Sequence, residues 1–282
     1  MNHFEMRWRL EDGVELYAQG WQPDAEPKAV VCLVHGLNEH SSRYAHVAAA
    51  LNQAGYAVLA FDHHGHGRSG GLRGHIPSSS IYLESLDCLL QEAAQRYAGK
   101  PRFLYGHSLG GILVLYYTLS RKPVLAGVIA ASAGLRTALE EQKFKITLTK
   151  WLSPVLPKLS IPTGLDPNQL SRDPEVVKAY IKDPLVEKHA TLGLARSTLT
   201  AIQYTFEHAH EFHLPLLLMH GDHDQIAYPR GSQEFASLVH SSCTIKLWEG
   251  LYHETHNEPE KDQVLAYVIS WLDDQMERQN RD

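Results

Sequence analysis

The sequence predicts an α/β protein with a mostly parallel central sheet, an antiparallel N-terminal edge, helices on both faces and an inserted helical cap. Three observations predict it: short apolar runs alternate with longer amphipathic stretches, a hairpin pattern opens the chain, and a proline-rich interval interrupts the alternation. Short strands that are apolar on both faces are typical of parallel sheets covered by helices. With 282 residues, 44% of them hydrophobic, the chain can form a single domain, residues 1–282, that carries such an insertion.

The elements are expected in the following order. Two alternating segments, 4–10 and 14–21, flank Asp12-Gly13, a pair that favours a hairpin turn. Buried strands are predicted at 29–34, 57–61, 103–105, 127–131, 214–219 and 244–248. Apolar residues at helical spacing predict helices at 44–54, 81–97, 112–119 and 264–276. Ligands of such sheets bind beyond the carboxyl ends of the strands, so the functional side chains are expected there.

The interval from residue 134 to about residue 205 is predicted to be the cap, because it is too long for a plain loop. It has no run typical of a buried strand, and it holds Pro154, Pro157, Pro162, Pro167, Pro174 and Pro184. Its segment 144–152 is apolar with interleaved lysines, and the next apolar residues are Val155, Leu156, Leu159 and Ile161. Two interpretations stay open: transient contact with an anionic lipid surface, and packing of the cap on its own domain.

Composition narrows the partners and the location. The formal net charge of −6 argues against a nucleic-acid partner, because phosphate binding requires a cationic surface. Neither a secretory signal nor an apolar stretch of the roughly 18 residues that a membrane span needs is visible. Cys32, Cys88 and Cys243 have no disulfide-like or metal-ligand spacing. We expect a cytoplasmic protein, peripheral to a membrane only if the cap docks on one, and the oligomeric state stays open.

The pentad Gly106-His107-Ser108-Leu109-Gly110 predicts a nucleophile at Ser108. Such a pentad alone is weak, but this one follows a predicted strand and precedes a predicted helix. In a strand–turn–helix setting the glycines let two backbone segments pass closely around a strained serine. The alternative is a glycine-rich turn with an incidental serine.

A serine nucleophile needs a base, and the base needs an acid that orients it. In this type of sheet the acid and then the base follow the serine, on loops after late strands. Asp224 is the preferred acid because it stands beyond the turn after strand 214–219, whereas Asp222 sits within that turn, where a short acceptor commonly caps backbone N–H groups. His253 is the preferred base because it is nearer to the end of strand 244–248, which leaves His256 to line the pocket.

Acyl transfer also needs N–H donors for the developing oxyanion, each worth about 3 kcal/mol. One donor is expected to be the backbone amide of Leu109, directly after the nucleophile. The other is expected in His35-Gly36-Leu37-Asn38, where the His-Gly turn makes Leu37 the candidate.

The histidine-rich segment 62–69, Asp-His-His-Gly-His-Gly-Arg-Ser, suggests a metal site at first sight. Its histidines alternate with glycines and have no acidic or cysteine partner at a recognised ligand spacing. The chain has 18 histidines, so some clustering is expected. A tight structural turn is the preferred interpretation, and we predict no metal.

Three motifs together resemble the monoglyceride lipase family, lysophospholipase-like serine hydrolases of the α/β-hydrolase fold. They are residues 35–44 (HGLNEHSSRY), 62–69 (DHHGHGRS) and 106–111 (GHSLGG), and residues 252–258 (YHETHNE) are similar to the family's catalytic-histidine loop. The resemblance covers residues 8–273 outside the cap. It assigns the nucleophile, acid and base to Ser108, Asp224 and His253, and the oxyanion amides to Leu37 and Leu109. It also implies a polar pocket for a glycerol head, lined by Glu39, Arg43, His107 and His256.

The resemblance implies hydrolysis of single-chain acyl esters, above all monoacylglycerol to fatty acid and glycerol, through an acyl-enzyme on Ser108 and without a cofactor. A lysophospholipase, a general carboxylesterase and an aminopeptidase are the alternatives among enzymes; a haloalkane dehalogenase would need Asp in place of Ser108. Outside enzymes, the alternatives are a catalytically silent ligand-binding protein of this fold and a membrane scaffold that uses the cap. For Glu39 and Arg43, an ion pair that braces the oxyanion loop is the alternative to glycerol contact.

Overall fold

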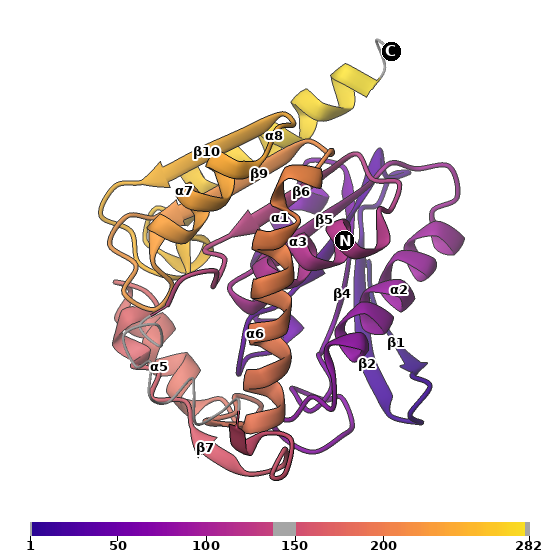
Figure 1. The fold of residues 1–282 in the computed structure, drawn as a ribbon. Coiled ribbons are helices and arrows are strands. Elements are labelled where there is room, and N and C mark those ends of the chain that lie inside the picture. Colours follow the sequence, from indigo (N-terminus) through magenta and orange to yellow (C-terminus); the bar gives the residue numbers. More distant parts are fainter. Residues whose placement is uncertain (1, 138–150, 280–282) are drawn as a thin grey trace.

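An eight-stranded sheet runs through the protein, with its strands in the order β1-β2-β4-β3-β5-β6-β9-β10 (Figure 1). The computed structural model describes residues 2–137 and 151–279. The pairings of β1 with β2 and of β2 with β4 are antiparallel, and all later pairings are parallel. The strands are β1 (Asn2–Arg9), β2 (Glu15–Gln22), β3 (Ala29–Val34), β4 (Tyr56–Phe61), β5 (Arg102–His107), β6 (Gly127–Ala131), β9 (Leu216–Gly221) and β10 (Cys243–Trp248). The predicted fold class is confirmed.

Helices cover both faces of this sheet, which is why its inner strands are apolar throughout. Val30, Cys32 and Val34 of β3 join one apolar cluster, and the alternate residues of the same strand join a second. The first cluster includes side chains of α2 (Ser79–Arg96), α3 (Leu109–Arg121), α6 (Leu192–Glu207) and α7 (Pro229–Leu238). The second includes side chains of α1 (Ala45–Gln53) and α8 (Lys261–Gln279). The sequence pattern located every one of these helices except α6 and α7.

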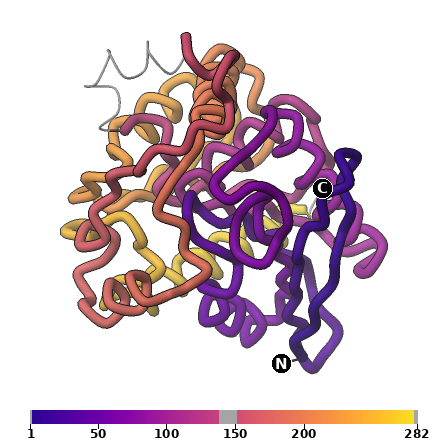
Figure 2. The backbone as a smooth tube through the Cα atoms, turned by 90° about the horizontal axis from the view of Figure 1, so that it is seen from below, coloured from indigo at the N-terminus to yellow at the C-terminus, as the bar shows by residue number. Residues whose placement is uncertain are grey.

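The segment that was predicted to be a helical cap also contains a small sheet. Strands β7 (Ser160–Pro162) and β8 (His189–Thr191) pair antiparallel, and α5 (Pro174–Lys182) lies between them in the chain. All three side chains of β7 are exposed, so no alternation of apolar residues could reveal this strand. In Figure 2 the segment (salmon) and the N-terminal hairpin (indigo) lie on opposite sides of the molecule. Of the apolar stretch 144–152, residues 144–150 lie outside the described residues.

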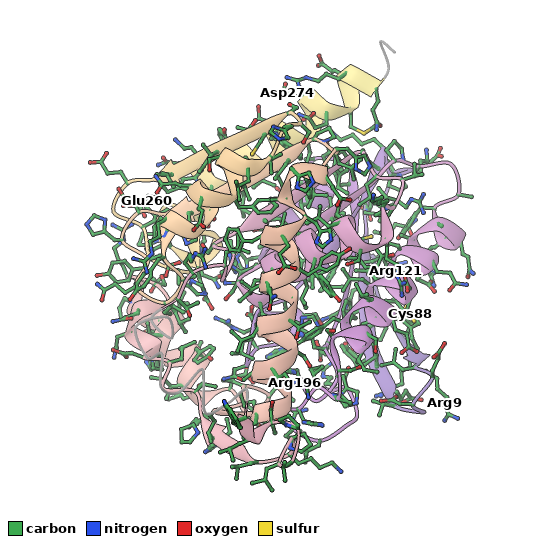
Figure 3. The ribbon with its side chains drawn as sticks, viewed as in Figure 1. Arg9, Cys88, Arg121, Arg196, Glu260 and Asp274 are labelled. Atoms are coloured by element: carbon green, nitrogen blue, oxygen red, sulfur yellow. The ribbon has the colours of Figure 1, made fainter. Side chains whose placement is uncertain are left out.

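Helix α6, at the end of the predicted insertion, packs against α2 and α3 beside the main sheet. Its exposed residue Arg196 is labelled in Figure 3, near the end of α6 that adjoins β7 and β8. The insertion therefore returns to the body of the molecule at α6.

Three contacts tie this insertion to the loop that follows β3. Asn38 donates a side-chain hydrogen bond to Thr163 (3.2 Å), and its carbonyl accepts from the Glu187 amide (3.2 Å). His40 Nε2 lies 2.9 Å from the carboxylate of Asp183, the residue after α5. The insertion thus contacts residues that lie one and three positions beyond Leu37.

Candidate active site

Ser108 occupies a sharp turn between β5 and α3. Its φ of 54° and ψ of −113° are strained for a residue with a side chain, a conformation that costs on the order of 1–3 kcal/mol. A Cβ at Gly106 would collide with the Gly110 carbonyl, and a Cβ at Gly110 would collide with the carbonyl of Val34. The two glycines of the pentad are therefore required by the close approach of three backbone segments. This is the geometry of a nucleophile elbow.

The side chains of Ser108, His253 and Asp224 form a continuous chain of hydrogen bonds. His253 Nε2 lies 2.9 Å from Ser108 Oγ, and His253 Nδ1 lies 2.7 Å from Asp224 Oδ2. Because Nδ1 faces a carboxylate, it carries the proton, and the lone pair of Nε2 points at the serine hydroxyl. The arrangement can take a proton from the serine as its oxygen attacks.

The Asp224 carboxylate is buried and accepts four hydrogen bonds. Oδ1 accepts from the Ile226 and Ala227 amides (2.8 and 2.9 Å), and Oδ2 accepts from His253 and from His220 Nε2 (3.1 Å). Burial alone would raise the pKa of Asp224, but the charge on His253 and these hydrogen bonds outweigh it and hold the pKa well below its usual value. Asp224 is therefore ionised throughout the pH range in which His253 gains or loses its proton.

Asp222, the competing acid, binds elsewhere. Its Oδ1 accepts from the Gly250 amide (2.7 Å) and lies 2.7 Å from His223 Nδ1, at the exposed surface of the turn. The structure thus brings Asp224, and not Asp222, to His253.

The pKa of His253 is raised above 6.5. Burial disfavours the charged imidazolium, but the charge of Asp224 and its hydrogen bond outweigh burial, with further contributions from Glu254 and Glu39. The neutral form, which alone can accept the serine proton, consequently becomes dominant only at a pH above that value.

The loop after β3 lies directly against the nucleophile. A Cβ at Gly36 would be 3.2 Å from the Cβ of Ser108, and Asn38 completes the turn with a φ of 62°. Within the described part of the chain the Leu37 amide donates no hydrogen bond. Leu109 is the first residue of α3, where an amide has no acceptor inside the helix. Both amides thus lie on segments that adjoin Ser108, as oxyanion donors must.

Glu39 holds this loop in place through both of its carboxylate oxygens. Oε1 accepts from the Gly36 amide (2.6 Å) and the Tyr44 hydroxyl (2.7 Å), and Oε2 accepts from Arg43 (2.6 Å). The bracing interpretation of the Glu39–Arg43 pair therefore has direct geometric support, because both oxygens already have protein partners.

Arg43 joins two buried carboxylates and the cap. It binds Glu254 in a bidentate manner (2.7 Å twice), and its guanidinium lies 4.9 Å from the centre of the Tyr180 ring on α5. Although burial opposes ionisation of Glu254, Arg43 lowers its pKa to about 2. Burial, with repulsion from Glu254, raises the pKa of Glu39 despite Arg43. The sequence analysis assigned no role to Glu254 or Tyr180. For Glu254, the available signal was its position directly after the candidate base, within the motif at residues 252–258.

His107 and His256 lie beside His253 and retain unused hydrogen-bonding capacity. The ring centre of His107 is 4.8 Å from that of His253 and 4.8 Å from that of His256. Burial holds the pKa of His107 far below its usual value and lowers that of His256 to about 3, so both rings are neutral. Nδ1 of His107 and both ring nitrogens of His256 have no hydrogen-bond partner among the described residues. These two buried rings, rather than Glu39 and Arg43, thus hold side-chain atoms whose hydrogen-bonding capacity is not satisfied by the protein.

Residues 62–69 form a tight turn that supports the loop after β3. Asp62 accepts from the Ser41 amide (2.8 Å) and the Arg68 amide (2.7 Å). His35 Nε2 accepts from the His63 amide (2.9 Å), so its Nδ1 carries the proton and donates to the Gly36 carbonyl (2.7 Å). Burial lowers the pKa of His63 to about 3. Over residues 2–137 and 151–279, no group of three potential metal-binding side chains comes together.

A parallel sheet with a strained serine at the end of β5, followed by a histidine and a carboxylate in hydrogen-bonding order, defines a serine hydrolase of the α/β-hydrolase fold. The pattern of the serine aminopeptidase S33 family matches residues 25–260, and the chain belongs to this family.

Known relatives agree with the resemblance that the sequence motifs indicated. A monoacylglycerol lipase of Mycolicibacterium smegmatis is 37% identical over 263 residues, covering 92% of this chain and 93% of that protein. The crystal structure of Paleococcus ferrophilus monoacylglycerol lipase has a TM-score of 0.85 and 36% identity, over 92% of this chain and 99% of that one. An uncharacterised abhydrolase domain-containing protein of Dictyostelium discoideum is 37% identical over 269 residues, and this chain spans 28% of its length. The predicted family relationship is confirmed.

We expect Asp224→Asn to lower kcat by about 10⁴-fold, because the neutral amide no longer holds the imidazole in the required tautomer. The kcat/KM of the unmodified enzyme should rise with pH, with a midpoint above 6.5, since Asp224 raises the pKa of His253. The residual activity of Asp224→Asn should have its midpoint at a lower pH. A pH series with a nitrophenyl ester measures both effects. Asp222→Asn is the matched control and should stay within about twofold; an equal loss there would contradict the choice of acid.

We expect Arg43→Met to lower the free energy of unfolding by about 3–5 kcal/mol, because it leaves Glu39 and Glu254 buried without their counter-charge. Chemical denaturation measures this loss. The control is Arg121→Met: Arg121, labelled in Figure 3, pairs with Asp87 at the surface, and such exposed pairs contribute at most about 1 kcal/mol. Similar losses in the two variants would show that the buried brace has no special role.

Proposed function

We propose that the protein is a serine ester hydrolase that cleaves monoacylglycerols into a fatty acid and glycerol. The observation that carries the proposal is the hydrogen-bonded chain Ser108–His253–Asp224, with the neutral side chains of His107 and His256 beside it. The identity to two monoacylglycerol lipases, 36–37% over more than nine-tenths of the chain, supports the substrate class.

The residues take the following roles in the reaction. Ser108 Oγ attacks the acyl carbonyl carbon while His253 Nε2 takes the hydroxyl proton, and the carbonyl oxygen becomes an oxyanion that accepts from the Leu37 and Leu109 amides. His253 then gives its proton to the leaving glycerol oxygen, and the C–O bond breaks to leave an acyl ester on Ser108. A water molecule, deprotonated by His253, attacks this ester; the bond to Ser108 Oγ breaks, His253 returns the proton to Ser108, and the fatty acid is released. Asp224 stays ionised throughout.

The glycerol head binds at His107 and His256. Their three unpartnered ring nitrogens offer both donors and acceptors, which suits hydroxyl groups. Glu39 and Arg43 do not contact the substrate directly. They hold Gly36 and the loop that carries the Leu37 amide in place.

This site disfavours the alternative substrates. A lysophospholipid would need a cation for its phosphodiester, but Arg43 already binds Glu39 and Glu254. An aminopeptidase would need a carboxylate for the peptide's ammonium group, and these same two carboxylates are held by Arg43. A desolvated charge without a partner is costly, so uncharged esters are favoured.

We further propose that the cap touches a membrane surface transiently. Trp151 and Val155 are largely exposed, and Leu156, Leu159 and Ile161 are partly exposed in the same stretch. Exposed apolar groups of this kind mark interaction surfaces, and tryptophan favours the membrane interface. None of the helices that the structure describes is both long and apolar enough to cross a bilayer. A cytoplasmic location, with the three cysteines as free thiols, fits this assignment.

In a panel of monoacylglycerol, diacylglycerol, lysophospholipid and short nitrophenyl esters, we expect the highest kcat/KM for monoacylglycerol. Ser108→Ala should lose essentially all turnover of every ester, because it removes the hydroxyl that faces His253 Nε2 and would form the acyl-enzyme. It should also no longer react with a fluorophosphonate probe. Hydrolysis that persists in Ser108→Ala would refute the mechanism. A preference for lysophospholipid would refute the substrate assignment.

We expect the double substitution Trp151→Ser, Val155→Ser to weaken binding to anionic vesicles by about tenfold or more, because it removes apolar surface from the contact. Cosedimentation with vesicles measures the binding, and turnover of a short nitrophenyl ester should stay unchanged. Val124→Ser is the matched control, since Val124 is 84% exposed, close to the 78% of Trp151, but precedes the amino-terminal end of β6, away from the cap. Unchanged vesicle binding of the double variant would rule out contact through this stretch.

A further inference from the structure

A second imidazole, that of His220, contacts the carboxylate of the candidate acid. His220 is the penultimate residue of β9 and is fully buried. Its Nε2 lies 3.1 Å from Asp224 Oδ2 and 2.8 Å from the Ala227 carbonyl oxygen. Its Nδ1 lies 2.9 Å from the hydroxyl of Ser232 on α7.

These neighbours fix the tautomer of His220. Nε2 faces two acceptors, a carboxylate and a carbonyl, so this nitrogen carries the proton. Nδ1 then has a lone pair, which accepts from the Ser232 hydroxyl. A strand, a helix and the turn between them thus hold one N–H group in a fixed direction, toward the carboxylate.

The two imidazoles share one carboxylate oxygen. Asp224 Oδ2 accepts from His253 Nδ1 at 2.7 Å and from His220 Nε2 at 3.1 Å. The other oxygen, Oδ1, is occupied by the Ile226 and Ala227 amides. Each N–H donor stabilises the negative charge on the carboxylate, so the second imidazole reduces the pull of Asp224 on the His253 proton.

We propose that His220 is a positioning residue for the reaction: its Nε2–H holds Asp224 Oδ2 toward His253 and takes up part of the hydrogen-bonding capacity of that oxygen. The proposal rests on the proposed function and adds to it a residue that touches neither the substrate nor Ser108. It implies that His220 sets the pH range of activity as well as the rate. Loss of its N–H group should let Asp224 hold the imidazolium form of His253 more strongly.

Other ionisable groups also face His253 and must be kept constant in a test. Three elements contribute them: β5, the loop after β3 and the His253 loop itself. They are His107, Glu39, Arg43, Glu254 and His256. Substitutions at His220 leave all of these in place.

The test compares His220→Leu, His220→Gln and Ser232→Ala in the full chain. Leucine removes the N–H group, whereas glutamine keeps an amide donor for Asp224 and an amide oxygen for Ser232. Ser232→Ala keeps the imidazole but removes the donor that fixes its tautomer. The readouts are the pH dependence of kcat/KM for a nitrophenyl ester and the number of active sites titrated by a fluorophosphonate.

For His220→Leu we expect kcat/KM per titrated site to fall about tenfold near neutral pH, with KM almost unchanged. The midpoint of the pH profile should move upward by about half a pH unit or more. His220→Gln should restore the midpoint of the unmodified enzyme and most of the rate. Ser232→Ala should move the midpoint in the same direction as His220→Leu, but by less.

Two results would overturn the proposal. The first is a pH midpoint that does not move in His220→Leu, together with a loss of rate that is fully explained by fewer titrated sites. If the leucine variant does not fold, the same result in Ser232→Ala has this meaning. The other is a His220→Gln variant as impaired as His220→Leu. Turnover that persists in Ser108→Ala would instead refute the proposed function, so the two failures are distinguishable.

Discussion

Each segment of the site is placed by the backbone turn at Ser108, where the end of β3, the end of β5 and the start of α3 approach to contact distance. Positions 106 and 110 leave no room for a side chain, so both must be glycine, and Ser108 itself has a strained backbone conformation. Strands β3 and β6 flank β5. The Leu37 loop therefore lies against this turn on one side, and on the other side the Ser108 amide donates a hydrogen bond to the Ala131 carbonyl oxygen. Strands β9 and β10 follow in the sheet order and lead into the loops that carry Asp224 and His253. The strain at one residue is thus supported by the register of the whole parallel sheet.

Much of this arrangement follows from the sequence, because it depends on local patterns and on the direction of parallel strands. Apolar runs located six strands of the main sheet, and the alternating segments around Asp12-Gly13 located the two N-terminal strands. The strand–turn–helix context of Ser108 distinguished a nucleophile elbow from a chance pentad. The preference for Asp224 over Asp222 used only their distances from the turn, and the structure brings Asp224 to His253 and Asp222 to Gly250. Side chains that follow the carboxyl ends of neighbouring strands necessarily meet at one edge.

The sequence could not predict interactions that depend on long-range pairing without a local pattern. Strand β7 has three exposed side chains and exists because it pairs with β8. Glu254 lies 211 residues from Arg43 in the chain, so no local pattern relates the two. The choice between glycerol contact and bracing could be made only once the hydrogen-bond partners of both carboxylate oxygens of Glu39 were known. His220 was one of 18 histidines, and its direction toward Asp224 comes from contacts with α7 and the turn before it. These features depend on contacts between distant parts of the chain and are visible only in the folded structure.

The attachment of the cap to residues 38 and 40 has a consequence for substrate entry. Displacement of α5 or β8 must either break the contacts with Asn38 and His40 or carry that loop along. The loop includes the Leu37 amide, so the free energy needed to displace the insertion on this side and the position of that amide beside Ser108 are thermodynamically linked.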